Sequence, residues 1–196
     1  MANQKISDFK SGFLGGTRAN RFNVEIVWPT GVVAEPATSI YHATASKLPE
    51  AELGSISIPY RGRVAHYAGD RDYKPWTVTI IDDTGTNASW LAFHQWANLL
   101  SSHVNNTVAD TTYGIGGSSN LCDVTFNQLN DPSSGGTDTF TGHTTMRTII
   151  LKHAWPSEVG QIGLDMGEGG SLVSFSVTFT YDYYEITKGL TTTTTP

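Results

Sequence analysis

Alternation of apolar and polar residues predicts β-strands along most of this chain. In residues 21–28, RFNVEIVW, Phe22, Val24, Ile26 and Trp28 share one face and Arg21, Asn23 and Glu25 share the other. Similar patterns predict a strand over 38–46, a hairpin over 55–69 with Pro59 and Gly62 near its tip, and strands over 76–82, 122–129 and 144–155.

The longest alternation is LVSFSVTFTYDYYE, residues 172–185. It predicts one long strand with an apolar face and a face of Ser, Thr and Asp. A half-buried strand of this kind is typical of an antiparallel sheet with one wet or contact-making face. The predicted apolar face comprises Val173, Phe175, Val177, Phe179, Tyr181 and Tyr183.

One segment has helical spacing instead. Trp90, Phe93, Ala97 and Leu100 recur at three- and four-residue intervals within 86–101, and Thr86, Asn87 and Ser89 are each suitable caps for its first turn. The fold class predicted is therefore mainly β: an antiparallel β-barrel or sandwich with one flanking α-helix.

The chain reads as one domain over residues 1–188, followed by a flexible Thr-rich tail at 189–196. The polar stretches 102–120 and 131–142 are predicted to be long loops. No apolar run approaches the length of a membrane span and the N-terminus lacks a secretory signal pattern, so we expect a cytosolically made protein without a membrane anchor.

Charge argues against a nucleic-acid-binding protein. The net charge is −6, the isoelectric point is about 5.4, and no basic patch is present. Affinity for DNA comes largely from Lys and Arg that neutralise phosphates. We therefore expect a surface that does not bind DNA.

Catalytic and metal-binding patterns are weak. The six histidines are scattered singly, Cys122 is the only cysteine, and the Gly-rich stretches GIGG and GEGG lack the lysine of a phosphate loop. We predict no catalytic, cofactor-binding or metal-binding residues and no cofactor. Two alternatives remain open: an enzyme with paired carboxylates, and a carbohydrate-binding β-sandwich that uses exposed Trp and Tyr.

Several ordered motifs resemble one family. RGRVAHYAGDRDYKPWTVTIIDD contains Arg61 and Arg63, then Ala-Gly-Asp-Arg at 68–71, then Pro-Trp at 75–76, and KHAWPSEVGQIGLD contains Trp155 and Pro156. Together with FHQWANLL and FSVTFTYDYYE, these segments resemble the tail tube proteins of contractile-tailed bacteriophages over residues 20–185.

The resemblance implies a structural virion protein that is not an enzyme. Its subunits would form hexameric rings that stack into the inner tube of a contractile tail, assembled in the host cytoplasm, with genomic DNA passing through the lumen without specific binding. Tail sheath, baseplate and tail terminator proteins would be its partners. A tube subunit of a bacteriocin or secretion system is the nearest alternative.

Site residues follow from the same motifs. We expect the hairpin 54–64, with Arg61 and Arg63, to reach the next ring. We expect GDRD to form an ordered corner in which Gly69 has a positive φ and Asp70 or Asp72 pairs with Arg71, within the chain or across a subunit boundary. We expect Trp76 to anchor the following strand in the core. We expect Trp155 and Pro156 to lie in a second corner.

Overall fold

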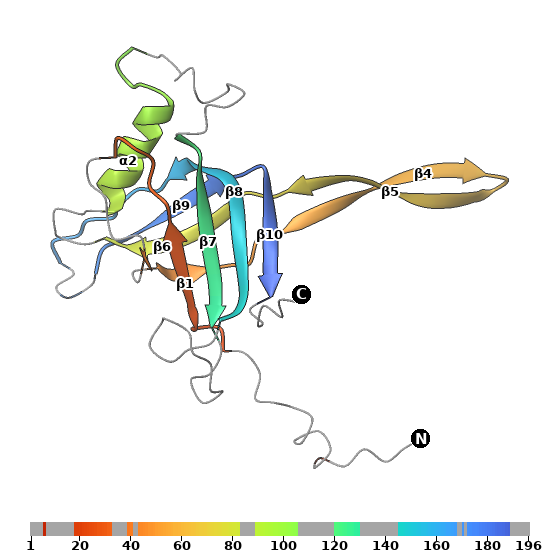
Figure 1. Cartoon of the computed structure of the whole chain (residues 1–196), viewed down its shortest axis with the longest axis horizontal. Helices are drawn as coiled ribbons and strands as arrows, with labels where there is room; N and C mark the ends of the chain where they lie inside the picture. Colours follow the sequence, from red (N-terminus) through yellow and green to blue (C-terminus); the bar gives the residue numbers. More distant parts are fainter. Residues whose placement is uncertain are drawn as a thin grey trace, which may run out of the picture.

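The computed structural model describes residues 6, 18–32, 39–40, 43–82, 89–105, 120–129, 145–167, 170 and 172–188. Two packed antiparallel β-sheets form the body, one helix lies against their core, and a two-stranded ribbon extends from the body (Figure 1). The predicted loop at 131–142 and the tail at 189–196 lie outside the described residues, as does most of the predicted loop 102–120.

The first sheet has the strand order β2–β1–β7–β8–β10. The strands are β1 (Phe22–Ile26), β2 (Ser39–Ile40), β7 (Cys122–Leu129), β8 (Thr145–Val159) and β10 (Tyr183–Lys188). Every neighbouring pair is antiparallel, as the alternating sequence predicts.

The second sheet has the order β3–β6–β9–β8, with β3 (Ala43–Ser46), β6 (Trp76–Ile81) and β9 (Ser174–Thr180). Strand β8 therefore belongs to both sheets. Among the described strands, β2, β3 and β10 each have one edge without a partner, so the body is a sandwich and not a closed barrel.

The corner between the sheets lies at His153. Residues 147–152 of β8 pair with β10, whereas 155–159 pair with β9. His153 has a φ of 53°, and its Nδ1 lies 2.8 Å from a carboxylate oxygen of Asp182, the residue at which β9 passes to β10. Both strands thus change sheets at the same place.

This corner corrects the prediction of one long strand from 172 to 185. The strand stops at Thr180 and a new one begins at Tyr183. The side chain of Tyr183 is exposed, whereas that of Tyr184 packs against the core. The predicted apolar face therefore holds through Tyr181 and reverses after Asp182, because the chain has turned into the other sheet.

Two other expectations change in detail. The strand predicted at 38–46 is two short strands, of which β2 pairs with β1 and β3 pairs with β6. The helix α2 spans Ser89–Leu100, and a carboxylate oxygen of Asp82 accepts a hydrogen bond from the Trp90 backbone N–H at its start. The predicted caps Thr86 and Asn87 lie outside the described residues.

The core fills the space between the two sheets and the helix. Strands β1, β7 and β8 contribute one wall, β6 and β9 the other, and α2 closes one end. Aromatic rings of the helix contact those of the second sheet, with Phe93 and Phe179 centroids 5.9 Å apart. The fully buried large side chains include Trp96, Phe93, Phe179, Ile26, Ile80, Leu151, Val24, Val78, Val124 and Val177.

Candidate assembly interface

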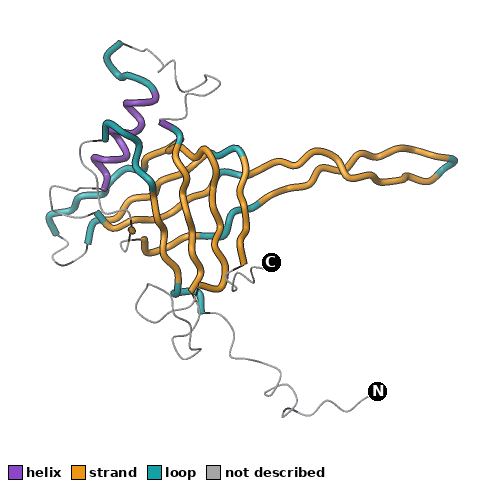
Figure 2. The backbone as a smooth tube through the Cα atoms, viewed as in Figure 1, coloured by secondary structure: helices purple, strands orange, loops and turns teal. Residues whose placement is uncertain are grey.

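The most distinctive surface of the molecule is the ribbon of β4 (Ala51–Tyr60) and β5 (Arg63–Tyr73), which we call the arm. These strands pair only with each other and run away from the body (Figure 2). Arg61 and Gly62 connect them with φ values of 45° and 79°. Two positive φ values in a two-residue loop are typical of a type I′ hairpin turn. The predicted hairpin is confirmed, and it is longer than the sequence indicated.

The arm exposes large apolar side chains on both of its faces. In the register, Ile56 and Ile58 lie opposite Tyr67 and Ala65, and Pro59 lies opposite Val64. Clusters of exposed apolar side chains mark surfaces that bind a partner. Six large apolar side chains of the arm are between 49% and 66% exposed: Leu53, Ile56, Ile58, Tyr60, Val64 and Tyr67.

The outer arm is also basic. Between Ser55 and Ala68 the sequence contains Arg61 and Arg63 and no carboxylate. The Arg61 guanidinium lies 5.5 Å from the centroid of the Tyr60 ring. Neither arginine forms an ion pair within the described part of the chain. The tip thus presents an aromatic ring and two unpaired cations.

A β-bulge lies near the base of the arm. Leu53 pairs with Arg71 and Ser55 pairs with Ala68, so Gly54 faces both Gly69 and Asp70. A Cβ on Gly54 would lie 3.1 Å from the Asp70 carbonyl oxygen, and one on Gly69 would lie 3.2 Å from the Gly54 oxygen. Gly54 and Gly69 therefore allow a close backbone approach at the bulge. The prediction that Gly69 has a positive φ in a corner is wrong.

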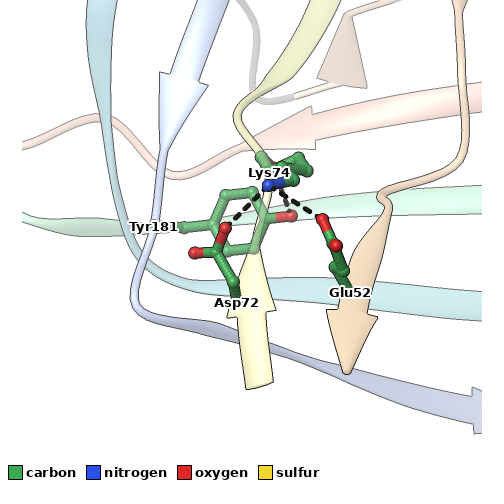
Figure 3. Close-up of polar contacts among 4 residues, drawn as sticks. All are labelled: Glu52, Asp72, Lys74 and Tyr181. Atoms are coloured by element: carbon green, nitrogen blue, oxygen red, sulfur yellow. Dashed lines mark hydrogen bonds and ion pairs between the residues drawn. The ribbon is translucent and has the colours of Figure 1, made fainter. Parts of the chain in front are cut away.

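At the root of the arm, Lys74 joins the two strands (Figure 3). Its Nζ lies 2.8 Å from an Asp72 carboxylate oxygen and 3.2 Å from a Glu52 carboxylate oxygen. The hydrogen bond from Lys74 lowers the pKa of Asp72, and the same bond raises the pKa of Lys74. Glu52 and Asp72 are paired across the ribbon, so the ammonium group relieves the repulsion between them.

The expected ion pair of Arg71 with Asp70 or Asp72 is therefore wrong within the chain. Asp72 pairs with Lys74, and Arg71 and Asp70 form no ion pair in the described ranges. Adjacent residues of a strand point to opposite faces, so Asp72 is closer to Lys74, two residues away, than to Arg71. A partner for Arg71 on another subunit stays a prediction.

The root is tied to the body by aromatic residues. The Tyr181 hydroxyl donates to the Lys74 carbonyl oxygen at 2.8 Å, and the Tyr73 ring lies 6.1 Å from Tyr181 and 5.4 Å from Tyr184. Trp76 is 2% exposed and its ring contacts Phe179. Trp76 anchors strand β6 in the core, as predicted.

Trp155 and Pro156 lie in strand and not in a turn. They pair with Thr180 and Phe179 of β9, Pro156 is buried, and Trp155 packs against the core. The corner in this motif lies two residues before Trp155, at His153. The arm and the Trp-Pro pair are therefore separate features of the fold.

The outward faces of both sheets are polar. On the first sheet, a Glu25 carboxylate oxygen accepts hydrogen bonds from the Asn23 and Asn127 amides at 3.3 Å each. The Lys152 Nζ lies 2.6 Å from an Asp123 carboxylate oxygen. On the second sheet, the hydroxyls of Thr77 and Thr178 are 3.2 Å apart. Neither face shows a run of cations among the described residues.

The described residues contain no group of three His, Cys, Asp or Glu side chains that could hold a metal ion. Cys122 is buried, and burial raises the pKa of its thiol to about 11, which suppresses the reactive thiolate. No helix in the described ranges is long and apolar enough to cross a membrane.

Sequence reasoning missed three residues that shape the arm. Gly54 was visible as a glycine interrupting a strand, which is a common sign of a bulge. Lys74 stands between Tyr73 and Pro75 without a pattern that marks it as a bridge. Tyr181 was assigned to the apolar face, but nothing in the sequence connects its hydroxyl to the Lys74 carbonyl.

Comparison with solved structures supports the fold. A chain in the cryo-EM structure of the anti-feeding prophage cap superposes with a TM-score of 0.60 at 15% identity, covering 90% of this chain and 93% of that one. A chain in the extended sheath–tube complex of the PVC extracellular contractile injection system gives 0.57 at 14% identity, covering 95% and 99%.

Sequence relatives extend over nearly the same range. The tail tube protein gp19 of Enterobacteria phage T4 is 25% identical over 182 residues, which cover 92% of this chain and 99% of that protein. The tail tube protein of Serratia phage KSP90 is 25% identical over 183 residues, covering 90% and 93%. The family model described as phage tail tube protein matches residues 17–187. This chain therefore belongs to the phage tail tube protein family.

Proposed function

We propose that this tail tube protein forms hexameric rings, and that the rings stack into the inner tube of a contractile phage tail through which DNA leaves the capsid. The observation that carries the proposal is the exposed arm, whose apolar side chains have no partner within the described chain. An apolar surface of this size on a long ribbon is stabilised only by burial against other molecules.

The free strand edges support ring closure. Strands β2 and β10 at the two ends of the first sheet and β3 at the end of the second have unpaired edges among the described strands. Pairing of such edges between neighbours removes a template for uncontrolled aggregation. A head-to-tail contact of this kind closes into a ring when its rotation closes.

Partners in the particle follow from the stacked tube. The tube contacts the sheath along its outside, the baseplate at one end and the terminator at the other. The similar solved structures come from a tube-terminating cap, a baseplate and a sheath–tube complex, which is consistent with these three classes of neighbour. We expect this assembly to take place in the host cytoplasm.

The charge of the chain suits a conduit that DNA does not bind. Each copy has a net charge of −6. On the outward face of the first sheet, Lys152 is already paired with Asp123. The hydrogen bond to Asp123 raises the pKa of Lys152. Because Lys152 is paired with Asp123, that residue offers DNA phosphates no free ammonium group.

Concentration-dependent assembly tests the proposal. Purified protein is concentrated with and without short seeds of tail tube and imaged by negative-stain electron microscopy, with mass photometry for rings. We expect hollow tubes and six-subunit rings, and more tubes at higher concentration because stacking obeys mass action. Protein that stays monomeric with seeds and binds a glycan array tightly would contradict it in favour of a carbohydrate-binding module.

Binding to DNA tests the conduit separately. Fluorescence anisotropy with labelled duplex at low salt is the most demanding condition, because phosphate contacts are then strongest. We expect no binding by subunits or tubes. Tight binding that weakens steeply with added salt would show a basic stripe and would contradict the conduit, while leaving the tube architecture intact.

A further inference from the structure

A groove of about 390 Å³ lies at the root of the arm, where the chain enters β4 and leaves β5. It is lined by residues 45–50, 74–77 and Thr79. Leu48, Pro49 and Pro75 make much of its surface apolar. The Glu50 side chain is exposed and forms no ion pair within the described part of the chain, so the groove contains an unmatched carboxylate.

The charges around the groove favour a cationic occupant. Lys74 is already matched by Asp72 and Glu52. In and beside the groove there are three carboxylates, on Glu50, Glu52 and Asp72. There are only two lysines, Lys47 and Lys74, so the local net charge is negative. The only long segment of the described chain that combines exposed apolar side chains with unpaired cations and lacks carboxylates is the outer arm, which ends in Tyr60–Arg63.

The arm cannot place its tip in its own groove. Strand β4 is ten residues long, and a strand rises about 3.3 Å per residue, so tip and root are separated by about 30 Å. The Tyr181 hydrogen bond holds the root to the body, and the Lys74 bridge holds the two strands of the arm together there. The tip and the groove can therefore meet only between two copies, and each copy offers one of each.

We propose that the groove at the arm root binds the arm tip of another copy of this chain, with the Tyr60 ring against Leu48 and the prolines and with Arg61 beside Glu50. This inference rests on the proposed stacked tube, for which it names the receiving surface. Because donor and acceptor lie at opposite ends of the arm, the contact is heterologous and repeats from copy to copy without closing on itself.

A charge exchange tests the contact. Glu50→Arg or Arg61→Glu alone places like charges together, and we expect each to raise the concentration needed for tube formation by roughly tenfold or more. Combining the two substitutions restores opposite charges, so we expect a concentration within about threefold of the wild type. The control Asp165→Arg changes an exposed carboxylate outside the groove and should leave assembly unchanged.

Crosslinking tests the same contact by proximity. An Arg61→Cys variant is mixed with a Glu50→Cys variant, assembled, and treated with a short bis-maleimide; Cys122 is protected by its burial and raised pKa. We expect covalent dimers whose linked peptides contain positions 61 and 50. Arg61→Cys mixed with Asp165→Cys is the matched control and should give none.

The outcomes separate this inference from the tube itself. Wild-type tubes together with unaffected single variants and no 61–50 crosslink would overturn the groove contact and leave the tube standing. Crosslinks of position 61 to another surface of the chain would also overturn it. Wild-type protein that never forms tubes would instead contradict the proposed function, on which the contact depends.

Discussion

The sandwich body and the arm are built from the same strand-forming residues and differ in what surrounds them. In the body, Val78 and Ile80 of β6 are fully buried between two sheets. In the arm, Ile56 and Ile58 of β4 are 55% and 49% exposed. Two-stranded ribbons are only marginally stable by themselves. The body thus contains its own core, whereas the arm leaves its apolar side chains exposed and, in the proposed tube, supplies half of an interface.

This difference separates stability from assembly. Apolar burial in the body stabilises the folded subunit, and removing it unfolds the chain. Apolar side chains of the arm gain nothing until another molecule covers them. Substitutions in the two regions should therefore affect different measurements, and the following experiments test that separation from the largest effect to the smallest.

Shortening the arm should abolish tubes altogether. Replacing residues 56–67 by an Asn-Gly turn keeps the Ser55 and Ala68 pair next to a tight hairpin turn. We expect a folded subunit with a normal circular dichroism spectrum and no long tubes in electron micrographs. The Ser57→Ala variant, which keeps the arm length, is the control. Tubes of normal length from the shortened chain would show that the arm is not the stacking element.

Truncating a core aromatic should give the largest loss of stability. Trp76→Ala removes a ring that is 2% exposed and packed on Phe179, and such changes cost about 3–5 kcal/mol. Tyr60→Ala, at 66% exposure, should change the free energy of unfolding by less than about 0.5 kcal/mol while reducing assembly. Urea denaturation and tube yield measure the two. Equal losses of stability would remove the distinction between body and arm.

Tyr181→Phe should have an intermediate effect, because it removes the hydrogen bond to the Lys74 carbonyl. We expect a loss of about 1 kcal/mol. Burial raises the pKa of Tyr181 to about 12, so between pH 10 and 12 the unfolded chain loses this proton while the folded chain keeps it. Stability from this group is present below pH 10 and falls as pH rises.

The alkaline loss of stability is tested by comparing melting temperatures of the wild type and the Tyr181 variant. Melting temperatures between pH 9 and 11 should fall less steeply in Tyr181→Phe than in the wild type. Tyr183→Phe, which changes an exposed ring, is the control and should follow the wild type. Identical slopes in all three proteins would show that Tyr181 ionises as easily folded as unfolded.

The smallest effect is expected for the charges at the arm root. Lys74→Ala removes an exposed bridge, so the melting temperature should fall slightly at low salt and match the wild type at high salt. Arg71→Ala removes no ion pair within the described chain, so the melting temperature should not change. A loss of tubes from Arg71→Ala without a thermal shift would place its partner on another subunit.

Alternation located the strands of the body well because each has one buried face. Strand β7 has the predicted bounds of 122–129, and β1 and β6 lie within their predicted segments. Alternation failed at Asp182, since a period of two continues through a residue at which the chain changes sheets. The pattern of apolar and polar residues does not show that the strand before Asp182 and the strand after it belong to different sheets.

The arm was harder to predict because no buried face imposes a pattern on it. The GDRD cluster resembles a turn by composition, yet pairing with β4 keeps it in strand, and a bulge accommodates Gly69 and Asp70. The family match confirms the prediction of a tail tube protein that is structural and not an enzyme. The order of several motifs along the sequence was enough for that prediction. The ion pairing of Asp72 and Arg71 depends on strand register, which the sequence did not reveal.

The composition of the arm also affects whether free subunits aggregate before they assemble. An exposed apolar ribbon with unpaired edges is a seed for amyloid-like stacking. Pro59 removes one N–H donor from the ribbon, and Arg61 and Arg63 give every tip the same charge. The positively charged tips therefore repel one another, although each is attracted to a negatively charged surface. In the proposed tube, we therefore expect the residues that favour ordered growth also to keep free copies dispersed before growth starts.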